Sequence, residues 1–225
     1  LYRARGRRAA ADQPQMSQLI AGQIALPLDW SAGGQNEGTF IVGPSNEDAV
    51  RYLHHVSTWP VRAAILVGPA GSGRTSMGRI FVRETGGRVI DGPRSISEEE
   101  MFHAWNHAQS SKTPLLIIAE TPPSEWGVRL PDLESRLNAV PVLRIGEPDE
   151  NLARDLIESL FAQRGMVISP EITSYIVPRM ERTYEMIHKI VNALDAASLE
   201  QGRRLGIRLT RETLLSQGLI VPDLL

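Results

Sequence analysis

Nine consecutive residues between Gly68 and Ser76 have the types and spacing from which proteins build a phosphate-binding loop. The pattern G-x-x-x-x-G-K-[ST] is met, apart from its lysine, by Gly68, Pro69, Ala70, Gly71, Ser72, Gly73, Arg74, Thr75 and Ser76. Glycines in such a loop let consecutive backbone N–H groups turn inward and cradle phosphate oxygens at the start of a helix. The pattern therefore predicts a nucleotide site.

Arg74 stands where the pattern has lysine. Arginine keeps the positive charge but lacks the compact ammonium that fits between the outer phosphates, whereas Thr75 can still place its hydroxyl on a magnesium ion. We expect ADP or ATP with Mg²⁺ to bind weakly or not at all, and hydrolysis to be impaired. The alternative is a glycine-rich strand-to-helix turn without a ligand.

The elements around the loop indicate an α/β domain. Apolar runs at 62–67, 87–91, 114–119 and 140–145 are typical of buried strands in a mostly parallel sheet. Helices are expected between them at 75–84, at 97–109 with Ser97 as cap, and at 131–138. An earlier helix, capped by Asn46 or Ser45, should end before Trp59 and Pro60.

The chain changes character after Pro148, where only helical patterns follow. Apolar residues recur at three- and four-residue spacing over 149–164, 170–180, 182–201 and 210–217, with Ser169 and Thr210 as start signals. We predict three parts: an N-terminal tail with a linker (1–38), the α/β domain (39–147) and a small helical domain (148–225).

Composition narrows the function classes. The net charge of −2 and the absence of a basic stretch beyond the first eight residues argue against a large nucleic-acid surface. The 225 residues include no cysteine, which excludes disulfides and thiolate metal sites, and no apolar run is long enough to span a bilayer. We expect a cytoplasmic protein whose histidines, His188 among them, are ordinary helix residues without a metal.

Several separate stretches resemble the AAA+ class of nucleotide switches, and in particular DnaA and its shortened relative Hda. The segment 39–46 resembles the start of the family's ATPase domain, 115–126 and 130–137 resemble the sensor-1 strand and the arginine-finger box, and 194–199 resembles the lid helix. This resemblance implies a three-layer P-loop domain of the AAA+ type followed by a helical lid.

The resemblance also implies roles for residues near the nucleotide. Pro44 and Asn46 would border the adenine, and Asp91 would bind Mg²⁺ together with Thr75. Only fifteen residues lie between Thr75 and Asp91, so a strand–helix unit of the family is missing and about four strands should remain. Glu120 competes with Asp91 as the acidic site residue, although we expect it to point away as a surface residue.

Two arginines are further candidates. The resemblance makes Arg136 an arginine finger that acts in trans on the nucleotide of a neighbouring molecule; the alternative is a solvated helix residue. Arg182 would touch the nucleotide from the lid as the sensor-2 arginine, or else pair with Glu181 or Glu185 at the surface.

A short peptide before the α/β domain resembles the one with which Hda holds the DNA-polymerase sliding clamp. It consists of Gln23, Ile24, Ala25, Leu26, Pro27 and Leu28. A proline-stiffened peptide with two leucines can fill an apolar pocket on a partner. The alternative is a strand that packs on the chain's own body.

The resemblance favours a regulator of replication initiation that docks on the clamp and stimulates hydrolysis of DnaA-bound ATP. No room remains before Leu225 for the helix-turn-helix domain of DnaA, so sequence-specific DNA binding is not expected. Two alternatives stay open: an autonomous ATPase that uses Arg74, Thr75 and either Asp91 or Glu120, and a structural adaptor tethered to the clamp. Assembly with further copies of the chain also stays open.

Overall fold

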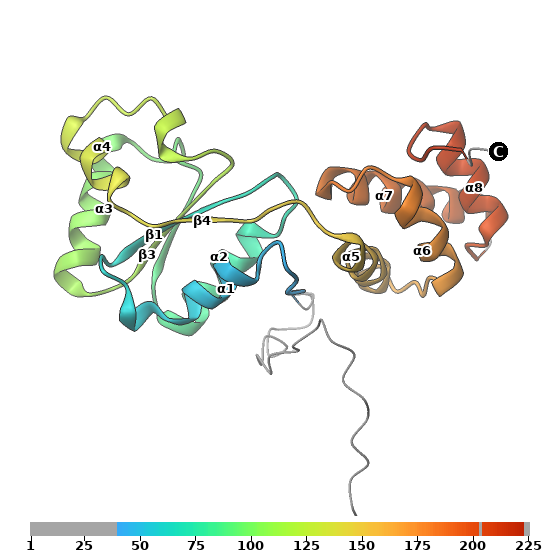
Figure 1. Cartoon of the computed structure of the whole chain (residues 1–225), viewed down its shortest axis with the longest axis horizontal. Helices are drawn as coiled ribbons and strands as arrows, with labels where there is room; N and C mark the ends of the chain where they lie inside the picture. The colour runs from blue at the N-terminus through green and yellow to red at the C-terminus, as the bar shows by residue number, and fades with distance from the viewer. Residues whose placement is uncertain (1–39, 203, 223–225) are drawn as a thin grey trace, which may run out of the picture.

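The computed structural model describes residues 40–202 and 204–222, which form an α/β domain and an all-helical lid (Figure 1). A single extended segment that follows the last strand connects the two. The peptide 23–28 lies outside the described residues. None of the helices in the described part is long and apolar enough to cross a membrane.

The α/β domain is built on a four-stranded parallel sheet in the order β2-β3-β1-β4. The strands are β1 (Ala63–Val67), β2 (Arg88–Asp91), β3 (Leu115–Ala119) and β4 (Val142–Arg144). Every residue of β1 and β3 is buried, as their unbroken apolar runs require when helices cover both faces of a sheet. The predicted reduced parallel sheet is therefore confirmed. The short strand β2 lies at one edge, so the missing strand–helix unit leaves no gap inside the sheet.

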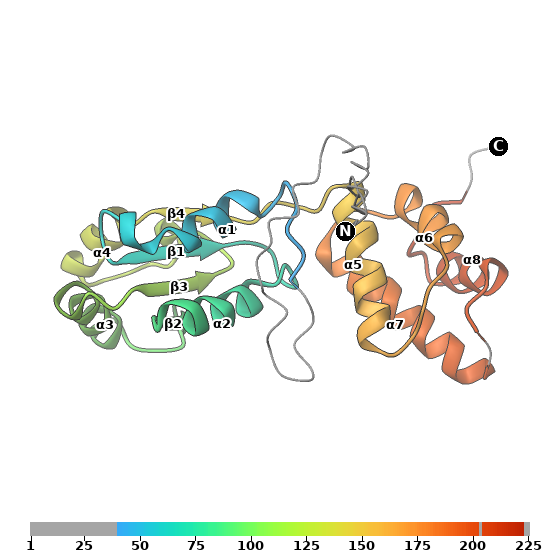
Figure 2. The same ribbon diagram turned by 90° about the horizontal axis from the view of Figure 1, so that it is seen from below.

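Two helices cover each face of the sheet (Figures 1 and 2). The helices α1 (Glu47–His54) and α2 (Arg74–Thr85) pack with one set of alternating strand residues, such as Leu66 and Ile118. The helices α3 (Glu98–Ser111) and α4 (Pro131–Asn138) pack with the other set, such as Ile65 and Ile117. Short 3₁₀ turns follow at Val56–Thr58 and Pro123–Glu125. The period of two along β1 and β3 thus divides the core into two layers.

The predicted helix starts are only partly confirmed. Ser97 caps α3 in a capping box with Glu100, since each side chain bonds to the other residue's backbone N–H. Asn46 occupies the cap position of α1, but its side chain makes no capping bond. It accepts a hydrogen bond from the Gly43 N–H and donates one to the Ile41 carbonyl, so it shapes the segment before α1 instead.

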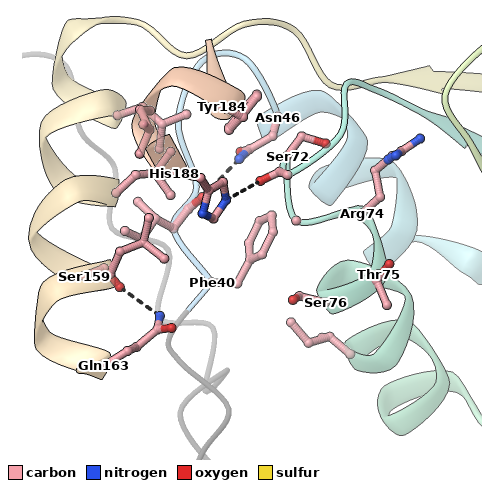
Figure 3. A pocket seen from close by; sticks show the side chains of 18 of the residues that line it. Phe40, Asn46, Ser72, Arg74, Thr75, Ser76, Ser159, Gln163, Tyr184 and His188 are labelled. Carbon is pink, nitrogen blue, oxygen red and sulfur yellow. Dashed lines mark hydrogen bonds between the residues drawn. The ribbon is translucent and has the colours of Figure 1, made fainter. Parts of the chain in front are cut away.

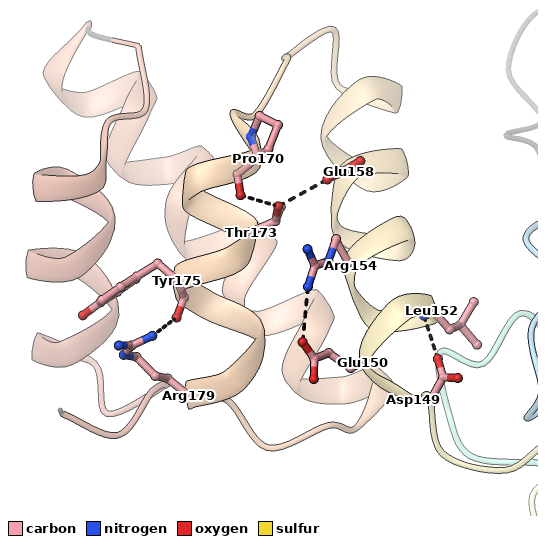
Figure 4. A network of polar contacts seen from close by, with 9 residues as sticks. All are labelled: Asp149, Glu150, Leu152, Arg154, Glu158, Pro170, Thr173, Tyr175 and Arg179. Carbon is pink, nitrogen blue, oxygen red and sulfur yellow. Dashed lines mark hydrogen bonds and ion pairs between the residues drawn. The ribbon is translucent and has the colours of Figure 1, made fainter. Parts of the chain in front are cut away.

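The lid consists of α5 (Glu150–Gln163), α6 (Pro170–Ile176), a 3₁₀ turn (Val177–Arg179), α7 (Tyr184–Gln201) and α8 (Ile207–Ser216). Figure 4 shows how local contacts fix its helix ends: Asp149 caps α5 at the Leu152 N–H, and the Thr173 hydroxyl joins α6 to Glu158 of α5. The predicted start at Thr210 is wrong, because α8 begins a turn earlier after Gly206 and Thr210 is buried within it.

The lid has its own apolar core, in which Phe161 is completely buried. Truncation to alanine removes most of a large side chain from a site whose neighbours cannot fully collapse. We expect Phe161→Ala to lower the free energy of unfolding by about 3–5 kcal/mol, measured by urea denaturation. Val167, which is 99% exposed, supplies the control: Val167→Ala should change stability by no more than about 0.5 kcal/mol. Equal effects of the two substitutions would contradict the assigned core.

Candidate functional site

The glycine-rich loop joins the end of β1 to the start of α2, as the sequence predicts. Gly71 and Gly73 have φ of +78° and +84°, which side-chain-bearing residues rarely adopt, and Gly73 is the N-cap of α2. The N–H groups of Arg74, Thr75 and Ser76 begin a helix and have no carbonyl four residues earlier within it. Such N–H groups favour an anion at this position.

The loop is covered closely on two sides. A Cβ atom on Gly71 would lie 2.9 Å from Cδ2 of His188 in α7, and one on Gly73 would lie 3.0 Å from Cε2 of Phe40. His188 also places Nε2 3.4 Å from the Gly71 carbonyl oxygen. The lid, through His188, and the segment that begins at Phe40 thus both pack on the loop. Their closeness is a second reason for glycine at these positions.

Thr75 and Asp91 lie together, as predicted for a magnesium site. The Thr75 hydroxyl donates a hydrogen bond of 2.8 Å to Oδ2 of Asp91, the last residue of β2. Hydroxyl and carboxylate oxygens are the donors that Mg²⁺ prefers, with phosphates and water completing its shell. The residues present therefore fit magnesium, although Gly92 provides no second carboxylate.

Arg74 does not project into the space above the loop. Its Nη2 lies 3.2 Å from Oε1 of Glu120, which directly follows β3. In Figure 3 the Arg74 guanidinium is turned away from Phe40 and His188. Glu120 is 68% exposed, as expected of a surface residue, but its pairing with Arg74 was not predicted. The reason is the sheet order: β1 and β3 are neighbours in register, with Val67 opposite Ala119, so the residues that follow them meet.

A cavity of about 450 Å³ lies between the loop and the lid (Figure 3). The predicted residues Asn46 and Gly71 to Ser76 line it, together with apolar residues of α5 such as Leu152 and Leu156. Pro44, Gly68, Pro69 and Ala70 are not among its lining residues. Gly68 instead packs against the residue that follows β4, because a Cβ there would lie 2.9 Å from Cβ of Ile145.

The structure does not bring Arg182 to the cavity. This residue is exposed and precedes Thr183, whose side chain caps α7. The lining residues from this region are Tyr184, Ile187 and His188, which share one face of α7. Tyr184 and His188, rather than Arg182, are therefore the polar groups that α7 brings to the site.

Sequence reasoning did not name most of the other lining residues, among them Phe40, Arg79, Arg83, Tyr184 and His188. For the two arginines a signal existed, since Thr75, Arg79 and Arg83 follow one another at four-residue spacing and so share a helix face. Nothing local marked the other three, because their role depends on how the lid folds back on the loop.

Tyr184 connects the lid to the α/β domain. Its side chain belongs to the same buried cluster as β1 and α2, and its hydroxyl lies 3.2 Å from the Ser45 hydroxyl. Burial raises the pKa of Tyr184 above the ordinary 10.0, because removal from water penalises the charged phenolate.

Arg136 lies away from the cavity, on α4 and so on the opposite face of the sheet from α2. Its guanidinium lies over the rings of Phe102 and Trp105, at 4.4 and 4.5 Å from their centroids. It also donates hydrogen bonds to Asn106 and, at 3.4 Å, to Asp132. The side chain is 26% exposed, so it is neither a solvated residue nor an extended one.

Comparison with known proteins shows what these features are similar to. Residues 151–214 match the family model described as the lid domain of Hda. Domain III of the replication initiation protein DnaA from Thermotoga maritima superposes with a TM-score of 0.64 and 16% identity, over 81% of this chain and 95% of that one. The lid therefore resembles that of Hda, and the chain as a whole has the fold of DnaA domain III.

Two further matches are a solved structure and a sequence relative. The AMPPCP-bound DnaA of Aquifex aeolicus has a TM-score of 0.55 and 16% identity, over 72% of this chain and 65% of that one. An uncharacterized protein of Haemophilus influenzae is 30% identical over 118 residues, which are 52% of this chain. The chain spans about half the length of this curated relative. The predicted AAA+ domain with a helical lid is thus confirmed.

The raised pKa of Tyr184 predicts a pH dependence of stability. The folded chain retains the phenol proton to higher pH than the unfolded chain does. The stability that Tyr184 contributes is therefore complete below pH 10 and is lost as the pH rises through the folded pKa. We expect the difference in free energy of unfolding between the unsubstituted protein and Tyr184→Phe to decrease as the pH rises above 10. A difference independent of pH would contradict the burial of this phenol.

Proposed function

We propose that this Hda-like protein regulates replication initiation by stimulating the hydrolysis of ATP bound to DnaA while docked on the sliding clamp. The observation that carries the proposal is the match of residues 151–214 to the Hda lid domain, on a chain with the DnaA domain III fold. Both partners belong to the replication machinery, so the protein would act in the bacterial cytoplasm at the nucleoid.

Its own cavity would hold ADP or ATP with Mg²⁺, but weakly. Support comes from the volume of about 450 Å³ between loop and lid, and from the AMPPCP bound by a DnaA of the same fold. Thr75 and Asp91 would hold the magnesium ion, which when bound would neutralise phosphate charge. Asn46 and the apolar residues of α5 would enclose the base.

Turnover in this cavity should be slow. Arg74 is paired with Glu120, and Gly92 stands where a second carboxylate is expected. An active site for phosphoryl transfer needs both charge stabilisation around the outer phosphates and a group that orients the attacking water. The chain's catalytic contribution would therefore be made on a partner's nucleotide.

Arg136 is the residue we propose for that contribution. It lies across the sheet from the chain's own cavity, which supports a role on the nucleotide of another molecule rather than on its own. Its stacking on Phe102 and Trp105 and its bonds to Asn106 and Asp132 restrict the side chain. A restricted guanidinium loses less entropy when it meets a phosphate than a freely moving one.

Replacement of this residue tests the proposed role. With clamp loaded on DNA, we expect Arg136→Ala to lower the turnover of DnaA-bound ATP by about 10³-fold or more. Arg136→Lys should recover little, because lysine keeps the charge but cannot form the planar bidentate contact. Arg211→Ala, which removes an exposed arginine of α8, should leave turnover unchanged.

The stability of each variant, and the ATPase activity of the protein without its partners, must be measured together with the turnover of DnaA-bound ATP. Loss of the two ring contacts should cost Arg136→Ala about 1–2 kcal/mol of unfolding free energy, which is separable from a defect in a chain that stays folded. Unchanged ATP turnover in a folded Arg136→Ala variant would refute the finger. Phosphate release by the protein alone that Thr75→Ala abolishes would favour an autonomous ATPase instead.

The second part of the proposal concerns the peptide Gln23–Leu28. We expect the double substitution Leu26→Ala and Leu28→Ala to weaken binding to purified sliding clamp about a hundredfold or more, because two apolar side chains lose their burial. The measurement is surface plasmon resonance with immobilised clamp. Leu19→Ala with Ile20→Ala, a matched pair nearby in the sequence, should bind normally, and equal binding by all three proteins would exclude clamp docking through this peptide.

A further inference from the structure

The guanidinium of Arg74 is the charged group with which the loop could bind phosphate, and it already forms an ion pair with Glu120. The two side chains differ in environment: Arg74 is 13% exposed and Glu120 is 68% exposed. The arginine is therefore held against the protein, while the carboxylate reaches it from the solvent side.

The sheet fixes the two ends of this pair. Arg74 is the first residue of α2, and Glu120 is the first residue after β3. The Gly68 N–H donates a 3.3 Å hydrogen bond to the Ala119 carbonyl, so the start of the loop is joined to the residue just before Glu120. Strand pairing thus brings the two residues near each other, and the long side chain of Arg74 spans the remaining distance to Glu120.

Carboxylate and phosphate oxygens compete for the same guanidinium donors. Arginine binds both with the same planar arrangement of N–H groups. In Figure 3 the Arg74 guanidinium is turned away from Phe40 and His188, which border the cavity. A phosphate in the loop can use this guanidinium only by displacing Glu120 or by binding beside its negative charge.

The neighbouring contact between Thr75 and Asp91 is different in kind. Thr75 is a neutral donor, and its hydroxyl and the Asp91 carboxylate could both turn to a magnesium ion that arrives with the nucleotide. A magnesium ion has no comparable role between Arg74 and Glu120, because their opposite charges already neutralise each other. Glu120 is therefore the residue that opposes phosphate binding.

We propose that Glu120 is an internal competitor for Arg74 that weakens the affinity of the cavity for nucleotide polyphosphates. This rests on the proposed function in one respect, namely that the cavity binds an adenine nucleotide. Glu120 would act through Arg74 as a positioning residue. The chain would hold its own nucleotide loosely because of a carboxylate that the sheet places there, as well as because lysine is absent.

The test compares two substitutions that change the charge equally. Glu120→Gln removes the competing charge, and Glu125→Gln removes the charge of an exposed glutamate five residues further on. Binding of fluorescent ADP and ATP with Mg²⁺ is measured by titration for each protein. We expect Glu120→Gln to bind both about two- to fivefold more tightly than Glu125→Gln, with the gain at least as large for ATP.

A double substitution shows whether the effect passes through Arg74. In an Arg74→Gln background, Glu120→Gln should bring no gain, because the group that it releases is absent. A gain that persists there would assign the effect to general charge and overturn the proposal. Equal affinity of Glu120→Gln and Glu125→Gln would also overturn it, while leaving nucleotide binding in place.

The two proposals fail in different ways. If neither the unsubstituted protein nor any variant binds nucleotide, the proposed nucleotide site fails and the competition falls with it. If Glu120→Gln alone binds, the competitor is supported in its strongest form, since the carboxylate would then suffice to close the site.

Discussion

The rest of the structure depends on the burial of β1 between β3 and β4. All five residues of β1 are buried, and parallel pairing on both sides holds its end in register with the ends of its neighbours. The residues that follow β1, β3 and β4 must therefore meet at one edge of the sheet. The glycine loop, Glu120 and Ile145 meet there for this reason, and the cavity develops from that meeting.

The same edge determines how the lid packs. The loop can be covered closely only where it has no side chains, and Gly71 and Gly73 provide those places for His188 and Phe40. Tyr184 then extends the buried cluster of the α/β domain into α7. The lid therefore packs directly on the loop, and a ligand between them would contact both domains.

Two arginines with opposite environments lie on the two faces of this sheet. Arg74 begins α2, on the face covered by α1 and α2, and the carboxylate of Glu120 neutralises its charge. Arg136 lies on the face covered by α3 and α4, where two aromatic rings, the Asn106 amide and, at 3.4 Å, the Asp132 carboxylate hold its guanidinium while part of it stays exposed. Both guanidinium groups have a carboxylate partner, but only that of Arg136 also lies over aromatic rings, which attract a cation without cancelling its charge.

Much of the fold could be predicted from the sequence, because its signals are local. Unbroken apolar runs indicated β1 and β3, Ser97 with Glu100 indicated the start of α3, and the glycines indicated the loop. Even the contact of Thr75 with Asp91 was anticipated, through the family resemblance. Residue type alone predicted one helix start wrongly. Threonine is a common N-cap residue, but Thr210 is buried inside α8.

What the sequence by itself determined was the set of elements and the chemistry of the loop, since backbone preferences and apolar periods act between residues that are close along the chain. Only the tertiary structure decided the partners of the charged side chains. It paired Arg74 with Glu120, placed Arg136 over two aromatic rings, and brought His188 to the loop while leaving Arg182 outside the cavity. The physical reason is that these partners are 30 to 117 residues apart in the chain and meet only through strand order and domain packing.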